Sequence, residues 1–201
     1  MQDYKYYYEG AIFYCYPDTN ILINKFHIKD EAELDKIESR ISSLKAIELR
    51  NKICENKFDF KHFCAIHHYL FCDIYEWAGQ ARKGGFMSKG STIFANSDFI
   101  ESLFNDFYEK LQNENFLKGL GKQDFCEKLA VYMGEVNYIH PFREGNGRTS
   151  RLYFAQLAEN AGYKLLFNKI DKDELLLADV LAYQGNYRLL IDILNQITTS
   201  I

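Results

Sequence analysis

The chain has 201 residues, of which 47% are hydrophobic and 16% aromatic, and its formal net charge is −4 at pH 7. A chain of this length should bury roughly 70% of its unfolded surface, and this length predicts one domain over residues 1–201. The hydrophobic content excludes global disorder. The acidic balance excludes nucleic-acid binding through bulk positive charge. The five cysteines are scattered and odd in number, and no apolar run approaches the ~20 residues of a membrane span, so we expect a cytoplasmic protein with reduced thiols and no membrane partner.

Helical periodicity dominates the chain, and we expect an all-α bundle. The tyrosine-rich arm "YKYYYEGAIFYCYPDTN" is compatible with extended backbone that ends in a turn. The arm and a first helix are expected to occupy about residues 1–50, and the core of the domain about residues 50–195. The stripes that mark the first four helices are Leu34, Ile37, Ile41 and Leu44; Phe60, Phe63, Ile66, Leu70 and Ile74; Phe99, Leu103, Phe107 and Leu111; Phe125, Leu129, Met133 and Val136.

Three more helices follow these four. One should begin near Asn146 and end just before Gly162, which suits the first position past a helix end. The segments "KDELLLADVLAYQ" and "YRLLIDILNQI" predict the last two. The stretch from Ala81 to Ser97 differs, because it combines several glycines with short apolar alternation, and we expect a β-hairpin or an irregular flap there.

Within the second helix, "CAIHHYLFC" places Cys64, His67, His68 and Cys72 close to one face and invites a zinc interpretation. One straight helix cannot arrange four ligands tetrahedrally around one ion. Core thiols and a hydrogen-bonded histidine are therefore the favoured interpretation.

The stretch "IHPFREGNGRTSR" gathers chemistry-bearing residues between the fourth and fifth helices. A helix N-terminus that follows glycines suits a phosphate, because its backbone N–H groups are free and the macrodipole is positive there. Arg148 and Arg151, three residues apart, predict a polyphosphate site. Glu144 offers the hard oxygen that Mg²⁺ requires, and His140 is the natural base for a hydroxyl proton. Phe142 is expected to anchor the turn in the core.

This stretch matches every fixed position of the Fic (filamentation induced by cAMP) signature, H-P-F-x-[DE]-G-N-G-R-x-x-R, and resembles that family closely. "EWAGQAR" and "SKGSTIF" resemble the segment before the Fic flap and the flap itself. The resemblance covers most of residues 15–195 and implies the Fic helical bundle with a small β-hairpin flap over the active site.

The resemblance also implies roles for individual residues in an enzyme that transfers AMP from Mg·ATP to a Ser, Thr or Tyr hydroxyl of a target protein. His140 would be the general base, and Glu144 would hold the Mg²⁺. The anion hole would be formed by Gly145, Asn146 and Gly147, with Arg148 and Arg151 on the outer phosphates. Flap residues would lie over the nucleotide and dock the target by strand addition; they are Lys89, Gly90, Ser91 and Thr92. A lysine in a loop is more often solvated than a ligand, and this is the alternative interpretation of Lys89.

The resemblance to the Fic family also bears on how the enzyme would be regulated. Many Fic proteins carry an inhibitory [ST]-x-x-x-E-[GN] helix, but no Glu-Gly or Glu-Asn pair in these 201 residues has Ser or Thr four positions earlier. The resemblance then implies a separate small antitoxin-like partner that supplies the helix, in a toxin–antitoxin pair; an effector delivered to another cell is the alternative setting. The alternatives to AMP transfer are Fic-type transfer of another phosphate-containing group and a non-catalytic, nucleotide-responsive binding module.

Overall fold

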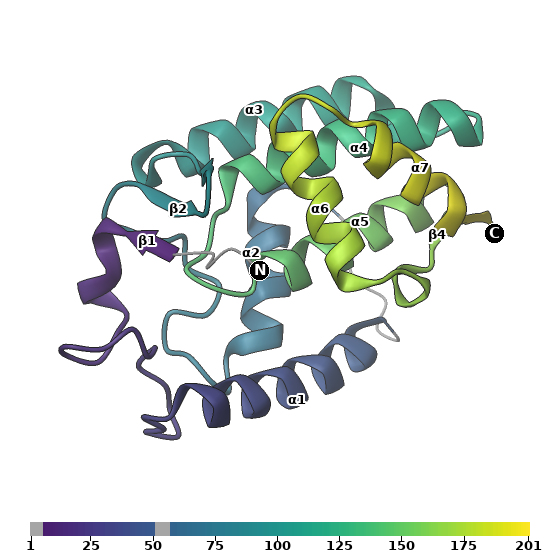
Figure 1. Ribbon diagram of the computed structural model, residues 1–201. Helices are drawn as coiled ribbons and strands as arrows, with labels where there is room; N and C mark the ends of the chain where they lie inside the picture. Colours follow the sequence, from purple (N-terminus) through teal and green to yellow (C-terminus); the bar gives the residue numbers. More distant parts are fainter. Residues whose placement is uncertain (1–5, 51–56) are drawn as a thin grey trace.

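The computed structural model describes residues 6–50 and 57–201, and seven α-helices lie within these ranges. Figure 1 shows α3 and α4 along one side of the molecule and α1 along the opposite side, with α2 and α5 between them. The helices are α1 (Glu31–Arg50), α2 (Phe60–Phe71), α3 (Ile100–Asn113), α4 (Lys122–Ile139), α5 (Asn146–Asn160), α6 (Lys172–Tyr183) and α7 (Arg188–Ile197). The sequence prediction of a helical bundle is confirmed.

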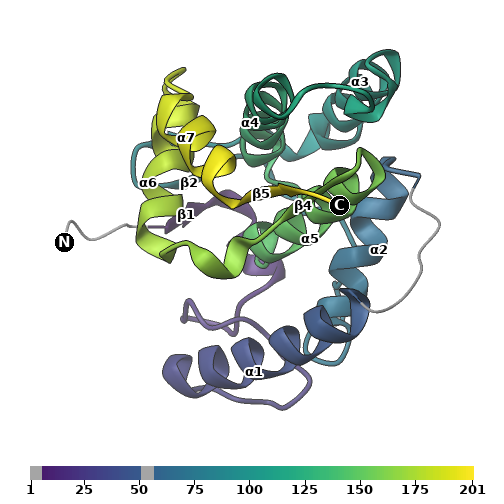
Figure 2. The ribbon, with the colours of Figure 1, turned by 90° about the vertical axis from the view of Figure 1, so that its right-hand side faces the viewer.

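Five short strands form two sheets among the described residues. The flap is a hairpin of β2 (Met87–Lys89) and β3 (Thr92–Ile93), and β1 (Tyr6–Tyr8) of the N-terminal arm pairs antiparallel with the outer side of β2. The arm therefore enlarges the predicted hairpin to three strands. Figure 1 shows β1 close to β2. A second pair joins β4 (Tyr163–Leu165) to β5 (Thr198–Ser200) and lies across the end of α5 in Figure 2.

The core runs through the whole described chain, from Tyr8 in β1 to Ile197 in α7. Local signals at the helix ends account for where the elements begin. Asp59 caps α2 by accepting a hydrogen bond of 2.8 Å from the backbone N–H of His62. Gly162, with φ of +89°, follows the end of α5 as the sequence predicts.

Two predicted apolar faces are only partly right. Leu44 of α1 is 63% exposed, whereas Glu38 and Ser42 on the same helix are buried. In α3, Phe107 and Leu111 are buried as predicted, but Phe99, which was expected in the stripe, precedes the helix and is 60% exposed. In α1 polar residues are buried because they contact a charged side chain of another helix. Apolar spacing alone therefore predicts the wrong face of this helix.

Candidate active site

The loop between α4 and α5 is locked by its own polar groups. The side chain of Asn146 accepts a hydrogen bond of 2.9 Å from the N–H of Phe142 and donates one of 2.8 Å to the carbonyl of the same residue. Gly145 has φ of +82°, and its N–H donates to Oε1 of Glu144 at 2.8 Å. The loop thereby delivers the chain to the first turn of α5, where backbone N–H groups have no helical partner.

Phe142 and His67 hold this loop against α2. The Phe142 ring is fully buried and stacks on the imidazole of His67, with ring centroids 3.8 Å apart. His67 accepts a hydrogen bond from the Gly79 N–H at Nδ1 (2.8 Å), so its Nε2 carries the proton and donates to the carbonyl of Glu144 at 2.9 Å. Both nitrogens of His67 are therefore used in hydrogen bonds, which fits the favoured core-histidine interpretation of "CAIHHYLFC".

Arg82 connects the flap to the loop, a role the sequence analysis missed. Its side chain is 1% exposed. Nε donates to the carbonyl of His140 at 2.8 Å, Nη1 to that of Gly85 at 3.0 Å, and Nη2 to that of Ala95. Because Gly85 and Ala95 flank the hairpin on its two sides, one guanidinium fixes both ends of the flap relative to His140.

Arg82→Met is expected to reduce the free energy of unfolding by about 3 kcal/mol, because one buried and two partly buried carbonyls lose their donors. Arg82→Lys should fall between this variant and wild type, since one ammonium cannot reproduce the fork. Urea unfolding measures both effects, with Lys83→Met at the exposed neighbouring position as the control. If Arg82→Met unfolds at the wild-type urea concentration, Arg82 does not connect the flap and the loop energetically.

His140 ends α4 in a left-handed conformation, with φ of 45° and ψ of 63°. Its imidazole stacks on Phe94 with a centroid separation of 3.7 Å, and its Nδ1 is buried without a hydrogen bond of normal geometry. Nε2 is therefore the nitrogen available to the adjoining cavity. Burial, aided by the positive charge of Arg82, lowers the pKa of His140 to about 3. The ring is thus neutral at physiological pH and can accept a proton.

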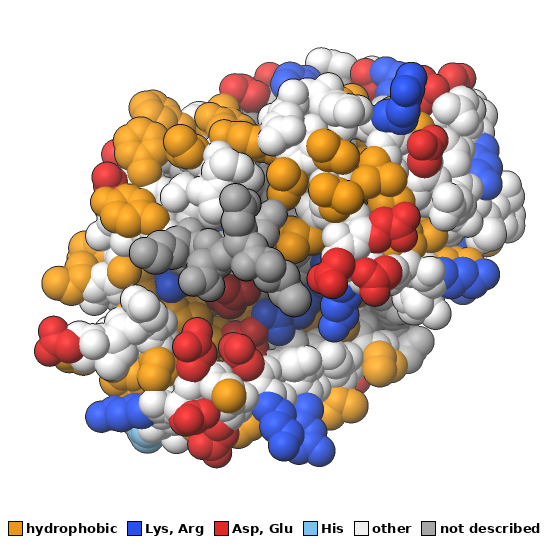
Figure 3. All heavy atoms as spheres, in the orientation of Figure 1, with side chains coloured by type: hydrophobic (Ala, Val, Ile, Leu, Met, Phe, Trp, Pro, Cys, Tyr) orange, Lys and Arg blue, Asp and Glu red, His pale blue; other side chains and the backbone are white. Residues whose placement is uncertain are grey.

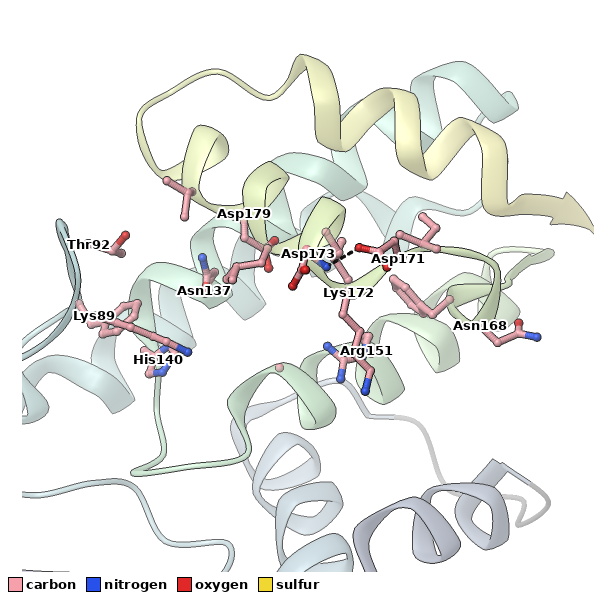
Figure 4. A pocket seen from close by; sticks show the side chains of 17 residues that line it. Lys89, Thr92, Asn137, His140, Arg151, Asn168, Asp171, Lys172, Asp173 and Asp179 are labelled. Carbon is pink, nitrogen blue, oxygen red and sulfur yellow. Dashed lines mark hydrogen bonds between the residues drawn. The ribbon is translucent and has the colours of Figure 1, made fainter. Parts of the chain in front are cut away.

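The first cavity, of about 520 Å³, lies between the flap, the start of α5 and helix α6. Figure 4 shows Lys89 and His140 at one end of it and Arg151 further along, beneath α6. Among the predicted site residues, those that line it are Lys89, Thr92, His140, Gly147 and Arg151. Gly90 and Ser91 form the exposed turn of the flap. Leu175, Leu176 and Val180 of α6 supply an apolar wall.

The second cavity, of about 930 Å³, adjoins the first and lies between α1, the N-terminal arm and the loop. Arg151 and Lys172 line both cavities, whereas Glu144 and Arg148 line only the second. Figure 3 shows acidic and basic side chains gathered in the hollowed part of this face. The predicted base and the predicted metal ligand therefore lie on two sides of the α5 N-terminus, with Arg151 between them.

Arg148 is held by helix α1. Its Nη1 donates to Oγ of Ser42 at 2.8 Å, its Nη2 pairs with the carboxylate of Glu38, and its guanidinium carbon lies 4.8 Å from the ring centre of Phe71. Nη2 is also 3.7 Å from Oε1 of Glu144. Sequence analysis did not anticipate Glu38 or Ser42, because no local pattern marks the partner of an arginine that lies far along the chain.

Asp179 of α6 is a further residue that the sequence analysis did not identify. It lines the first cavity together with Arg151, which opposes the effect of burial on its carboxyl group. Burial is the stronger influence and raises the pKa of Asp179 to about 6. The Asp179 carboxylate therefore takes up a proton at a higher pH than an exposed aspartate does.

The donor set around Glu144 bears on metal binding. Its carboxylate is 42% exposed and faces the second cavity. Within residues 6–50 and 57–201, no group of three or more His, Cys, Asp or Glu side chains could hold a metal ion. This arrangement fits a Mg²⁺ ion that keeps several waters and is shared with substrate phosphates, because such an ion needs only one or two protein carboxylates.

The expectations of reduced thiols and of no membrane-spanning segment concern the whole chain rather than the site. Cys15, Cys64, Cys72 and Cys126 form no disulfides, and Cys54 lies outside the described residues. No helix within the described ranges is both long and apolar enough to span a bilayer.

Comparison with known proteins places this geometry in a family. Residues 57–158 match the model of the Fic/DOC family. The chain is 39% identical over 180 residues to protein adenylyltransferase VbhT of Bartonella schoenbuchensis. The aligned region covers 89% of this chain and 37% of that protein. It is 35% identical to the probable protein adenylyltransferase y4lH of Sinorhizobium fredii, over 86% of this chain and 88% of that one.

Solved structures agree with the sequence comparison. One similar structure is the BepC effector protein of Bartonella tribocorum, crystallised with bound AMPPNP. It superposes on this chain with a TM-score of 0.89 at 29% identity, and the superposition covers 96% of this chain and 100% of that one. The family model matches more than half of the residues, and the fold agrees over nearly all of them. This chain is a member of the Fic/DOC family.

Proposed function

We propose that this chain is a protein adenylyltransferase, which transfers AMP from ATP to a hydroxyl side chain of a target protein and releases diphosphate. The observation that carries the proposal is the position of the His140 imidazole, which shares one cavity with Gly147 and Arg151 at the start of α5. Relatives that carry the name protein adenylyltransferase, and a similar structure crystallised with an ATP analogue, support it. One continuous core supports treating residues 1–201 as a single functional domain.

The reaction uses His140 as the general base. The hydroxyl oxygen of the target attacks the α-phosphorus, the bond from that phosphorus to the oxygen bridging the α- and β-phosphates breaks, and diphosphate leaves. The hydroxyl proton passes to Nε2 of His140, whose Nδ1 is buried. Backbone N–H groups of Gly145, Asn146 and Gly147 would stabilise the charge that develops on the phosphate oxygens. That of Gly145 donates to Oε1 of Glu144 in this structure and would be shared with the phosphate.

Arginines on the two sides of the α5 N-terminus would hold the outer phosphates. Arg151 lines both cavities and Arg148 lines the second, so a polyphosphate that extends across the N-terminus meets both guanidiniums. The apolar wall of α6 suits the nucleoside. Lys89 and Thr92 of the flap would then lie over the nucleotide.

Glu144 would hold Mg²⁺ together with the phosphates and water. When bound, the ion would neutralise phosphate charge and orient the polyphosphate. Glu144 is suited to this because its carbonyl is fixed by His67 and its Oε1 by the N–H of Gly145, which limits the motion of the carboxylate.

The target would dock at the flap as an added strand. One side of β2 is already paired with β1, and β3 pairs with β2 alone among the described strands. The outer edge of β3, near Thr92 and Ile93, is therefore the side at which an extended target segment could add.

The proposal extends to regulation and location. The 201 residues hold no [ST]-x-x-x-E-[GN] helix sequence, which supports inhibition by a separate small antitoxin-like protein in a toxin–antitoxin pair. The free thiols of the four described cysteines support a reducing compartment such as the cytoplasm.

The test compares ATP labelled at the α-phosphate with ATP labelled at the γ-phosphate. With Mg²⁺ and a bacterial lysate as the source of targets, the α-label should become covalently attached to protein and the γ-label should not. Intact-mass analysis should show the mass of one AMP group for each modified site. Attachment of the γ-label would indicate phosphate transfer, and bound but unreacted nucleotide would indicate a binding module; either result contradicts the proposal.

A further inference from the structure

The contact between α1 and Arg148 joins a part of the chain outside the matched family segment to the motif. Glu38 is 6% exposed and Ser42 is 1% exposed, although both are polar. Burying a carboxylate is costly unless it is paired and hydrogen-bonded. Both oxygens of Glu38 meet this condition, since Oε1 pairs with Arg148 and Oε2 accepts from the hydroxyl of Tyr75.

The remaining partners make this arrangement rigid. The Ser42 hydroxyl accepts from Arg148 and donates to the carbonyl of Glu38 at 2.7 Å. Tyr75 is buried, and its pKa is raised far above the usual range by burial and by Glu38, so its hydroxyl remains a donor. Glu38, Ser42 and Tyr75 therefore form a fixed receptor for one face of the Arg148 guanidinium, and we refer to these three residues as the α1 clamp.

Glu144 is the competing partner of the same arginine. Its Oε1 lies 3.7 Å from Nη2 of Arg148, within the range of an ion pair, but Glu144 is 42% exposed whereas Glu38 is 8% exposed at the side chain. Glu38 is the closer partner, and its hydrogen bonds with Arg148 and Tyr75 counter the burial that raises the pKa of its carboxyl group. Without Glu38, the nearest carboxylate to which Arg148 could turn is Glu144.

We infer that Glu38 is a positioning residue: through the α1 clamp it keeps Arg148 on α1, 3.7 Å from Glu144 and beyond hydrogen-bond distance, so that the Glu144 carboxylate stays accessible to a metal–nucleotide complex. The inference rests on the proposed function, because it presumes that Glu144 contributes to the binding of Mg·ATP. Helix α1 thereby has a role at the nucleotide site, which is to position Arg148. This role also explains why the inner face of this helix is polar.

The test measures nucleotide binding by calorimetry with a non-hydrolysable ATP analogue, once with Mg²⁺ and once with EDTA. The quantity of interest is the ratio of the Kd in EDTA to the Kd in Mg²⁺. In Glu38→Ala this ratio should fall about tenfold, the usual effect of losing a residue that orients a metal ligand. A merely structural defect would weaken both affinities by the same factor and leave the ratio unchanged.

Two further variants sharpen the test. Asp35→Ala removes an exposed carboxylate one turn earlier on α1, which also lines the second cavity, and should keep the wild-type ratio. Glu38→Ala combined with Arg148→Ala should restore the ratio toward wild type, because the arginine that the loss of Glu38 releases toward Glu144 is then absent. If Glu38→Ala does not fold, Glu38→Gln retains the shape and should show a smaller fall in the same ratio.

The possible failures are distinguishable. If wild-type protein binds no nucleotide under either condition, the proposed function itself fails and the inference with it. If wild type shows a Mg²⁺-dependent Kd and Glu38→Ala keeps the same ratio, the positioning role alone is overturned. An increase of affinity under both conditions would show that Glu38 restrains a phosphate-binding arginine, and this too contradicts the inference.

Discussion

His140→Ala is expected to lower kcat/KM for AMP transfer by at least about 100-fold, the lower end of what a positioned general base contributes. Nucleotide affinity should change little, because the phosphates would be held by the α5 N-terminus and by arginines rather than by the imidazole. The rate of incorporation of the α-label measures the first quantity, and calorimetry with an ATP analogue measures the second.

The control for this variant is His68→Ala, which removes an exposed histidine of α2 that bonds the carbonyl of Ala78. Its transfer rate should stay within a few-fold of wild type. Equal labelling in His140→Ala and wild type would refute the role of His140 as base, whereas parallel loss of nucleotide binding would show that the imidazole supports the pocket instead.

The pH profile gives an independent check on the same residue. A base must be unprotonated to act, and burial lowers the pKa of His140 from its ordinary value of 6.5 to about 3. Protonation of the free enzyme at this ring should therefore reduce kcat/KM only at pH values well below 6.5, and the profile should show no fall with a midpoint near 6.5. Such a fall, if it persists in Asp179→Asn, would indicate that the ring is solvated in the active protein, since Asp179 in the same cavity wall has a pKa of about 6.

Local features of the sequence predicted the motif region well. The start of α5 near Asn146 and its end before Gly162 follow from glycines and from capping preferences, which act over a few residues. The flap was also recognisable, because glycines and short alternation surround its strands. What these predictions share is that their physical causes lie within one turn of helix or one hairpin.

The remaining features depend on contacts between distant parts of the chain. The inner face of α1 was misjudged because Glu38 is buried by Arg148, 110 residues away, and apolar periodicity carries no information about such a partner. The roles of Arg82 and Asp179 depend equally on what folds against them. Strands β4 and β5 are three residues long and pair over more than thirty residues, too short for an alternating pattern to predict them.

Gly145→Ala is expected to destabilise the fold by about 2–5 kcal/mol and to abolish transfer. Its φ of +82° strains any residue with a Cβ by about 1–2 kcal/mol. In addition, a Cβ at this position would lie 2.4 Å from two ring carbons of Phe71, and overpacking of this kind costs about 1–3 kcal/mol more. Thermal unfolding should show a lower Tm, by about 2–4 °C for each kcal/mol.

Gly162→Ala separates the two causes, because Gly162 has φ of +89° but nothing lies within 4 Å of the added Cβ. This variant should lose about 1–2 kcal/mol from backbone strain alone and keep its transfer activity. The excess loss in Gly145→Ala then measures the contact with Phe71, the ring that also lies under the Arg148 guanidinium. If both variants lose the same free energy of unfolding, the Phe71 ring moves to accommodate the methyl group. Backbone conformation alone would then require glycine at the start of α5.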